Sequence, residues 1–216
     1  MLFMEFLFRF ILLCLLPITF AHAQFGIAWR VKPTIYVIGT EDDARHVDVV
    51  EAIAYWNEAL TEIGSAFRLG SVKKIVQPIP EDDLQLLSKL TVGSAVSIEV
   101  PKSLQNLSGD LTIFLANSDF VSFAGPFDAS AKRVVGIRSQ HLPPMHLPNV
   151  TRNVITHEIG HAMGLGHNGD TSMLMCGRPN SCRPNLFRSN TPFLFPLSDS
   201  EKTQLLDLYP TDWLPR

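Results

Sequence analysis

Three histidines and a glutamate in the segment HEIGHAMGLGH, residues 157–167, constrain this chain more than any other feature. His157 and His161 are four residues apart, so on an α-helix they lie on one face and can reach the same ion. Gly164 permits the positive φ angle with which many helices end. A sharp turn there brings His167 back beside the other two imidazoles. The spacing therefore predicts a helix that ends at a metal site.

The residue types indicate which metal this site would hold. Three imidazoles with an open fourth position are typical of catalytic zinc, whereas structural zinc sites are closed by four protein ligands. Glu158 lies beside the first histidine, where its carboxylate can act as a general base without binding the metal. With zinc to polarise a carbonyl group and activate water, the expected chemistry is hydrolysis of an amide bond. Chance occurrence of the spacing on an ordinary helix, and a zinc site without catalysis, are the alternatives.

The N-terminal segment has the pattern of a signal peptide. Arg9 precedes an apolar run at residues 10–20, and AHA at residues 21–23 fits a cleavage site. The run is shorter than the roughly 20 apolar residues that span a bilayer. We therefore expect residues 1–23 to be a signal peptide and residues 24–216 to be one secreted domain, extracellular or periplasmic. An uncleaved N-terminal anchor is the alternative.

Composition argues against several classes of partner. The 216 residues suit one domain, and the net charge of -3 gives no sign of the basic surface that binds nucleic acid. We expect no nucleic-acid partner, no membrane span once the signal peptide is removed, and a monomer.

The cysteines carry a prediction that depends on export. Cys14 would leave with the signal peptide, so Cys176 and Cys182 would remain. In an oxidising compartment two such neighbours favour a disulfide that closes a small loop. Two free, buried thiols are the alternative.

Hydrophobic periodicity predicts an α+β fold. Strands are expected where β-branched and apolar residues cluster, at residues 33–39, 67–76, 94–100, 111–116 and 133–139. Helices are expected at residues 43–63 and 81–90, in a site helix with Asn149 as its N-cap, and in a closing helix with Ser198 and Glu201 in capping-box spacing. This order predicts one mixed, twisted sheet with two long helices packed on it and a C-terminal helix.

The segment HEIGHAMGLGH resembles the HExxHxxGxxH signature of the metzincin zinc peptidases. In the following segment, NGDTSMLMCG, Met175 is similar in position to the methionine turn of the matrixin (matrix metalloproteinase) branch. Met173 is the alternative, although its spacing from His167 fits less well. The segments LSDSEKTQLLDLYP and EAIAYWNEAL also resemble matrixin helices.

This resemblance implies a metzincin-like catalytic domain that acts as a zinc endopeptidase on a protein or peptide substrate. One catalytic zinc would be held by His157, His161 and His167. Glu158 would act as general base and acid, and Met175 would support the site from below. Two other functions stay open: a zinc-bearing module that binds a peptide or partner without catalysis, and a zinc hydrolase of a non-peptide amide or ester.

The chain also departs from the matrixin pattern. Residues 117–136 lack a matching His/Asp pattern, so a structural calcium or a second zinc is not expected, and no cysteine-switch propeptide is expected before the first strand. Asn168 follows the third histidine, where matrixins usually have serine, and Cys176 replaces an aromatic residue. The edge strand that would bind substrate is expected between Phe120 and Ser139. His141 and His146 are expected to be loop histidines without a metal.

Overall fold

The computed structural model describes residues 28–91, 101–105, 107–125, 132–177, 188–189 and 191–216. The predicted signal peptide, the strand expected at residues 94–100 and Cys182 lie outside these ranges. Within the described ranges, no helix combines the length and the hydropathy needed to cross a membrane.

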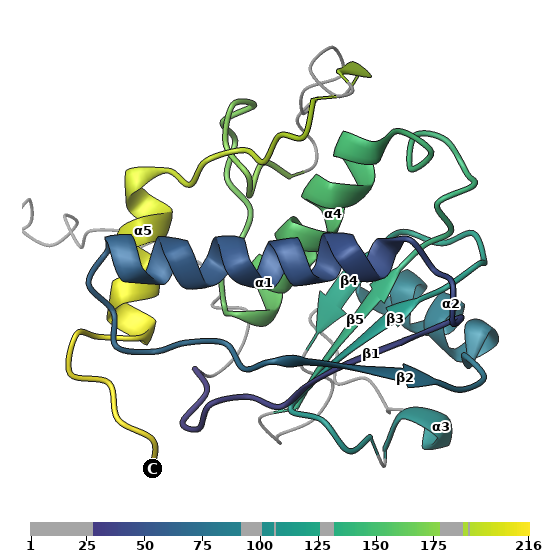
Figure 1. The fold of residues 1–216 in the computed structure, drawn as a ribbon, viewed down its shortest axis with the longest axis horizontal. Coiled ribbons are helices and arrows are strands. Elements are labelled where there is room, and N and C mark those ends of the chain that lie inside the picture. The colour runs from purple at the N-terminus through teal and green to yellow at the C-terminus, as the bar shows by residue number, and fades with distance from the viewer. Residues whose placement is uncertain (1–27, 92–100, 106, 126–131, 178–187, 190) are drawn as a thin grey trace, which may run out of the picture.

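The predicted helices and strands that lie in the described residues appear in the predicted order, and a short helix at residues 102–105 was not predicted (Figure 1). The strands are β1 (Ile35–Gly39), β2 (Val72–Val76), β3 (Leu111–Leu115), β4 (Phe123–Gly125) and β5 (Arg133–Ile137). The helices are α1 (Arg45–Glu62), α2 (Glu81–Thr91), α3 (Lys102–Gln105), α4 (Pro148–Ala162) and α5 (Asp199–Leu208). The predicted α+β class is confirmed, with two long helices, α1 and α4, and a C-terminal helix, α5.

The sheet is mixed and has the strand order β2-β1-β3-β5-β4. Strands β2, β1, β3 and β5 run parallel, and β4 pairs antiparallel with β5 at one edge. Phe123 of β4 lies opposite Gly136 of β5, where a Cβ atom would come within 2.6 Å of the phenylalanine ring. The predicted edge strand between residues 120 and 139 is therefore β4, and it lies against α4.

Each face of the sheet buries its own core, because successive side chains on a strand point to opposite faces. Ile35 and Val37 of β1 join the core that includes the buried residues of α1 and α4. Ile38, from the same strand, joins Phe114 of β3 in a second core with the buried leucines of α2 and α3. The sheet thus separates α1 and α4 from α2 and α3.

Strand β2 is shorter than the predicted strand at residues 67–76, because the first part of that segment is bonded to a helix instead. The side chain of Asn57 in α1 accepts from the N–H of Leu69 at 2.8 Å and donates to its carbonyl at 3.3 Å. These two bonds satisfy the Leu69 backbone outside the sheet, so pairing with β1 begins only at Val72.

The site helix α4 begins earlier than predicted, and Asn149 is not its N-cap. Leu147 takes the N-cap position, and Pro148 follows in the first turn, where its missing N–H costs nothing. Asn149 is buried and uses its side chain elsewhere.

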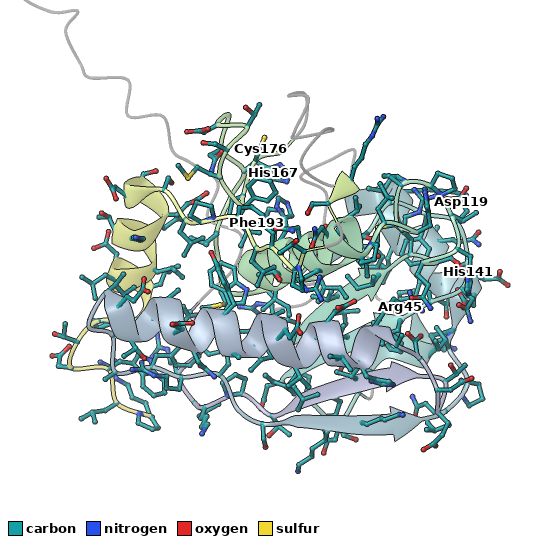
Figure 2. The ribbon with its side chains drawn as sticks, turned by 45° about the horizontal axis from the view of Figure 1, so that its top comes forward. Arg45, Asp119, His141, His167, Cys176 and Phe193 are labelled. Atoms are coloured by element: carbon teal, nitrogen blue, oxygen red, sulfur yellow. The ribbon has the colours of Figure 1, made fainter. Side chains whose placement is uncertain are left out.

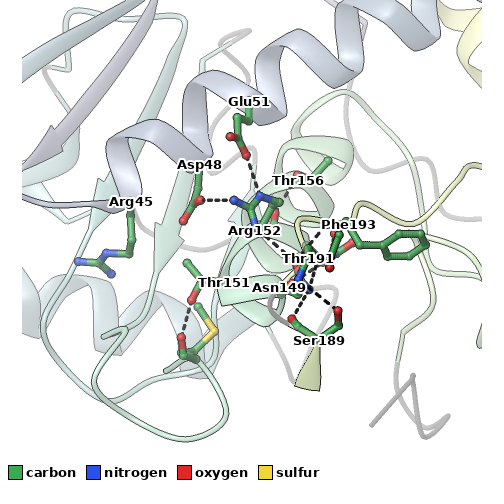
Figure 3. Close-up of polar contacts among 12 residues, drawn as sticks. Arg45, Asp48, Glu51, Asn149, Thr151, Arg152, Thr156, Ser189, Thr191 and Phe193 are labelled. Atoms are coloured by element: carbon green, nitrogen blue, oxygen red, sulfur yellow. Dashed lines mark hydrogen bonds and ion pairs between the residues drawn. The ribbon is translucent and has the colours of Figure 1, made fainter. Parts of the chain in front are cut away.

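Asn149 and Asn153, one turn apart on α4, bind backbone groups about 40 residues away in the sequence, and Figure 3 shows the contacts of Asn149. Asn149 donates to the carbonyls of Ser189 and Thr191 at 2.7 and 2.9 Å. Asn153 donates to the Phe193 carbonyl at 2.8 Å, and its own oxygen accepts from the N–H of residue 195 at 3.0 Å. These bonds anchor the backbone at residues 189, 191, 193 and 195 to helix α4.

Replacing Asp48 by asparagine should stabilise the protein above pH 6. Arg152 of α4 bonds to Glu51 of α1 at 2.7 Å but stays 3.6 Å from Asp48, as Figure 3 shows. Burial raises the pKa of Asp48 to about 6, despite the attraction of Arg152. The folded state then keeps a proton that the unfolded state has released, so stability falls as pH rises from about 4 to 6.

The expected loss across this range is about 2 kcal/mol at most, since one pKa unit corresponds to about 1.4 kcal/mol and the site is partly solvated. Urea unfolding of wild type and Asp48→Asn from pH 4 to pH 8 would measure it, with Asp42→Asn, at an exposed position, as the control. Parallel stability curves for wild type and Asp48→Asn would contradict the prediction.

Candidate metal centre

The predicted turn after the site helix is present. His157 and His161 lie on the last turns of α4, and the chain reverses at Gly164, whose φ angle is 106°. Backbone bonds close this turn, with the N–H of Leu165 donating to the carbonyl of Gly160 at 3.0 Å. The reversal carries His167 back to the other two histidines.

The three histidines form one group whose ligand atoms all lie within 4.8 Å of one another. The Nε2 atoms of His161 and His167 are 3.0 Å apart. Two ligands of a tetrahedral zinc ion are separated by about 3.3 Å, given zinc–nitrogen distances of 2.0–2.1 Å. The arrangement therefore fits a single zinc ion, and residues 157, 161 and 167 are brought together as predicted.

Backbone carbonyls orient two of the imidazoles. Nδ1 of His157 lies 2.8 Å from the carbonyl oxygen of Leu174, and Nδ1 of His161 lies 2.8 Å from that of Leu165. A carbonyl can only accept, so in each ring Nδ1 donates and Nε2 keeps its lone pair for a metal. Bonds of this kind hold metal-ligating histidines in the required tautomer and orientation.

Desolvation also affects two of the ligands. Burial lowers the pKa of His161 to about 4, so its imidazole is uncharged at neutral pH, and desolvation on the protein side lowers the pKa of the more exposed His167 as well. Neutral imidazole is the form that binds zinc. The metal-binding state thus does not require a proton to leave these two rings.

Glu158 is on α4 beside the first ligand and is 7% exposed. Among the described residues, the group that could hold a metal ion consists of the three imidazoles and does not include Glu158. Burial raises the pKa of this carboxyl group to about 8. A divalent cation bound nearby would favour the charged carboxylate and would therefore lower this pKa.

Of the two candidate methionines, Met175 is the one packed against the site helix. It is fully buried, whereas Met173 is partly exposed. A Cβ atom on Gly160 would lie 2.6 Å from the Met175 sulfur and 2.8 Å from the Trp56 ring. The side chains of Met175 and Trp56 therefore both pack directly against the backbone of Gly160.

Gly160→Ala should destabilise the protein by about 1–3 kcal/mol, the usual range for forcing an extra carbon into a packed core. The added methyl group would overlap Met175 and Trp56, both of which are fully buried. Thermal unfolding of the metal-free protein would measure the loss. Gly166→Ala is the matched control, because the space around that glycine is open. Equal stability of the two variants would contradict the prediction.

Sequence patterns did not reveal the residues that hold the ligands from outside the motif. The carbonyl of Leu174 orients His157, and Gly177 packs so closely on His167 that a Cβ atom would lie 2.1 Å from its ring. Cys176, between them, is buried and lies beside His167 in Figure 2. Its predicted disulfide with Cys182 stays a prediction, because Cys182 is outside the described residues.

The two loop histidines do not join the metal group. His141 and His146 are exposed, and Figure 2 shows His141 far from His167 along the molecule.

Comparison with solved structures finds a likeness of fold. The chain is similar to the crystal structure of archaemetzincin from Methanopyrus kandleri, with a TM-score of 0.50 and 19% identity over 81% of this chain and 94% of that chain. A structure described as a chaperone–substrate complex gives a TM-score of 0.45 and 15% identity over 70% of this chain and 28% of that chain, too weak to support an inference. No protein-family model matches the chain, and no curated protein matches its sequence. At 19% identity the likeness shows the fold alone: this chain has a metzincin-like α+β fold, with three histidines placed to bind one metal ion.

Proposed function

We propose that this protein is a zinc-dependent metallopeptidase that cuts internal peptide bonds. The observation that carries the proposal is the group of three imidazoles, two of them fixed by backbone carbonyls, together with the buried carboxyl group of Glu158, which follows the first of these histidines on α4. This combination offers a catalytic zinc site with a base beside it. The archaemetzincin-like fold supports the same class of enzyme.

The residues divide the reaction between them. Bound zinc would polarise the carbonyl of the scissile bond and make water a stronger acid. His157, His161 and His167 would hold the ion and leave one side open. Glu158 would take a proton from the attacking water, whose oxygen forms the new bond to carbon, and would pass that proton to the nitrogen as the C–N bond breaks. No covalent link to the protein is required.

Strand β4 is the proposed docking edge for the substrate. Among the described residues it is the outermost strand beside β5, and it contacts α4, the helix that carries the ligands. An extended peptide can add to such an edge through main-chain hydrogen bonds. This placement favours a polypeptide substrate over a small amide or ester.

Four further features belong to the proposal. They are a closer kinship with the matrixin branch, export directed by residues 1–23, a monomeric state, and a disulfide between Cys176 and Cys182. Sequence patterns support the matrixin kinship, the export and the disulfide, and the monomeric state is an expectation for a single domain.

Digestion of a mixed peptide pool by the purified, zinc-loaded protein tests the function. New termini inside the peptides, identified by mass spectrometry and suppressed by a peptide hydroxamate, are the expected result. Loss of terminal residues alone would overturn the endopeptidase assignment. Tight zinc binding without any cleavage would favour the non-catalytic binding module, and turnover confined to small amides or esters would favour the other hydrolase.

A further inference from the structure

His167 is the proposed ligand whose ring receives the least support. The rings of the other two donate to backbone carbonyls, whereas His167 is exposed. Within the described part of the chain, its ring contacts the other two imidazoles and Gly177, and no carbonyl accepts from its Nδ1. Its position must therefore come mainly from the backbone beside it.

Asn168 fixes that backbone through four hydrogen bonds. Its N–H donates to the carbonyl of Met175 at 2.9 Å, and its carbonyl accepts from the N–H of Gly177 at 3.2 Å. Its side-chain oxygen accepts from the N–H of Asp170 at 2.8 Å. Its side-chain nitrogen donates to Oε1 of Glu201. One residue thus joins the turn after the third ligand to the Met175 segment and to α5.

Glu201 is a firm anchor for this bond. It is 4% exposed and lies in the first turn of α5. Its second oxygen accepts from the N–H of Ser198 at 2.7 Å and completes the predicted capping box. Both carboxylate oxygens are therefore engaged, one by the helix cap and one by Asn168.

Helix α5 is itself tied to the end of α4. The Tyr209 hydroxyl donates to the carbonyl of Met163 at 3.0 Å, and the Gln204 side chain donates to that of Gly164 at 3.2 Å. Together with Glu201, these residues hold α5 against the turn that delivers His167. The anchor is therefore hydrogen-bonded, through its own helix, to the turn that delivers His167.

We propose that Asn168 and Glu201 are positioning residues for His167, and that their hydrogen bond holds the third ligand at the metal. The inference rests on the proposed zinc site and deepens it. Neither side chain needs to touch the metal or the substrate, because both act through the backbone next to His167.

Asn168→Ala and Glu201→Gln should each weaken zinc binding. The first removes both side-chain bonds of Asn168. The second leaves one oxygen to serve both Asn168 and the N–H of Ser198. Loss of an outer partner of a metal ligand usually lowers metal affinity 10- to 100-fold, and we expect about 10-fold here because the action is indirect. Competition with a chromophoric chelator measures the affinity, and the visible spectrum of the cobalt-substituted protein reports distortion at the metal.

Ser198→Ala is the matched control. It removes the other half of the capping box, in which the serine hydroxyl accepts from the N–H of Glu201, but keeps the bond between Asn168 and Glu201. It should lower the melting temperature of the metal-free protein while zinc affinity stays at the wild-type value. Equal weakening of zinc binding in Ser198→Ala would overturn the positioning role, because general loosening of α5 would then explain the effect.

A swap of donor and acceptor gives the strictest test. Asn168→Asp alone would place a carboxylate next to that of Glu201, and their repulsion should weaken zinc binding more than Asn168→Ala does. Combined with Glu201→Gln, it restores one donor facing one acceptor, so the double variant should recover most of the lost affinity, as coupling between contacting residues requires. No recovery, or wild-type affinity in both single variants, would overturn the inference. Wild-type protein that binds zinc but cuts no peptide would contradict the proposed function alone.

Discussion

Glu158→Gln should abolish peptide cleavage while leaving zinc in place. The amide has the shape of the carboxyl group but cannot accept a proton from water, and general-base catalysis typically contributes 10²- to 10⁴-fold. We therefore expect turnover to fall by about 10³-fold or more, with little change in KM, because the substitution leaves β4, the proposed docking edge, untouched. Initial rates on a peptide identified from the pool digestion, with zinc measured in the same samples, would show this.

Two results decide the role of Glu158. Glu62→Gln, the same change at an exposed position at the end of α1, should leave turnover unchanged. If Glu158→Gln holds zinc and cuts peptides at more than a tenth of the wild-type rate, the glutamate is not the base. In that case the buried carboxyl group would have only a structural role.

His161→Ala should remove both zinc binding and activity. His161 is 7% exposed, its Nδ1 is already committed to the Leu165 carbonyl, and its Nε2 faces that of His167. With two imidazoles left, tight binding of zinc is not expected. The variant should also lose the stabilisation that zinc gives the wild type, which is about 4 kcal/mol when free zinc exceeds Kd 1,000-fold.

Thermal unfolding with and without zinc, alongside metal analysis, would measure this loss. His141→Ala is the matched control, because it removes an exposed histidine outside the metal group. It should bind one zinc ion and show the full zinc-dependent shift in Tm. A zinc-dependent shift that survives in His161→Ala would contradict the assigned ligand set.

The parts of this site that could be predicted from sequence are those determined by local geometry. Four-residue spacing on a helix and one glycine with a positive φ angle are enough to bring residues 157, 161 and 167 together. The capping box of Ser198 and Glu201 is equally local, and it forms as predicted.

The parts that could not be predicted depend on contacts between distant residues. Asparagine is favoured at N-cap positions, yet helix α4 already begins at Pro148. The side chain of Asn149 instead donates to the backbone carbonyl of Ser189, 40 residues away in the sequence. In the same way, Asn57 takes the backbone of Leu69 out of the strand expected there. Asparagine bonds equally well to a near or a distant peptide group, so only the folded chain shows which one it takes.

The close packing of Trp56 under the site helix provides an intrinsic optical probe. Its ring lies against Gly160, between the proposed base and the second ligand, and its Nε1 donates to the Thr156 carbonyl at 3.0 Å. The other two tryptophans, Trp29 and Trp213, belong to an aromatic cluster around Phe67. Changing those two to phenylalanine would leave Trp56 as the single tryptophan, packed against the helix that carries two of the ligands. Its emission could then follow zinc entry and departure in real time, without a label and without a substrate.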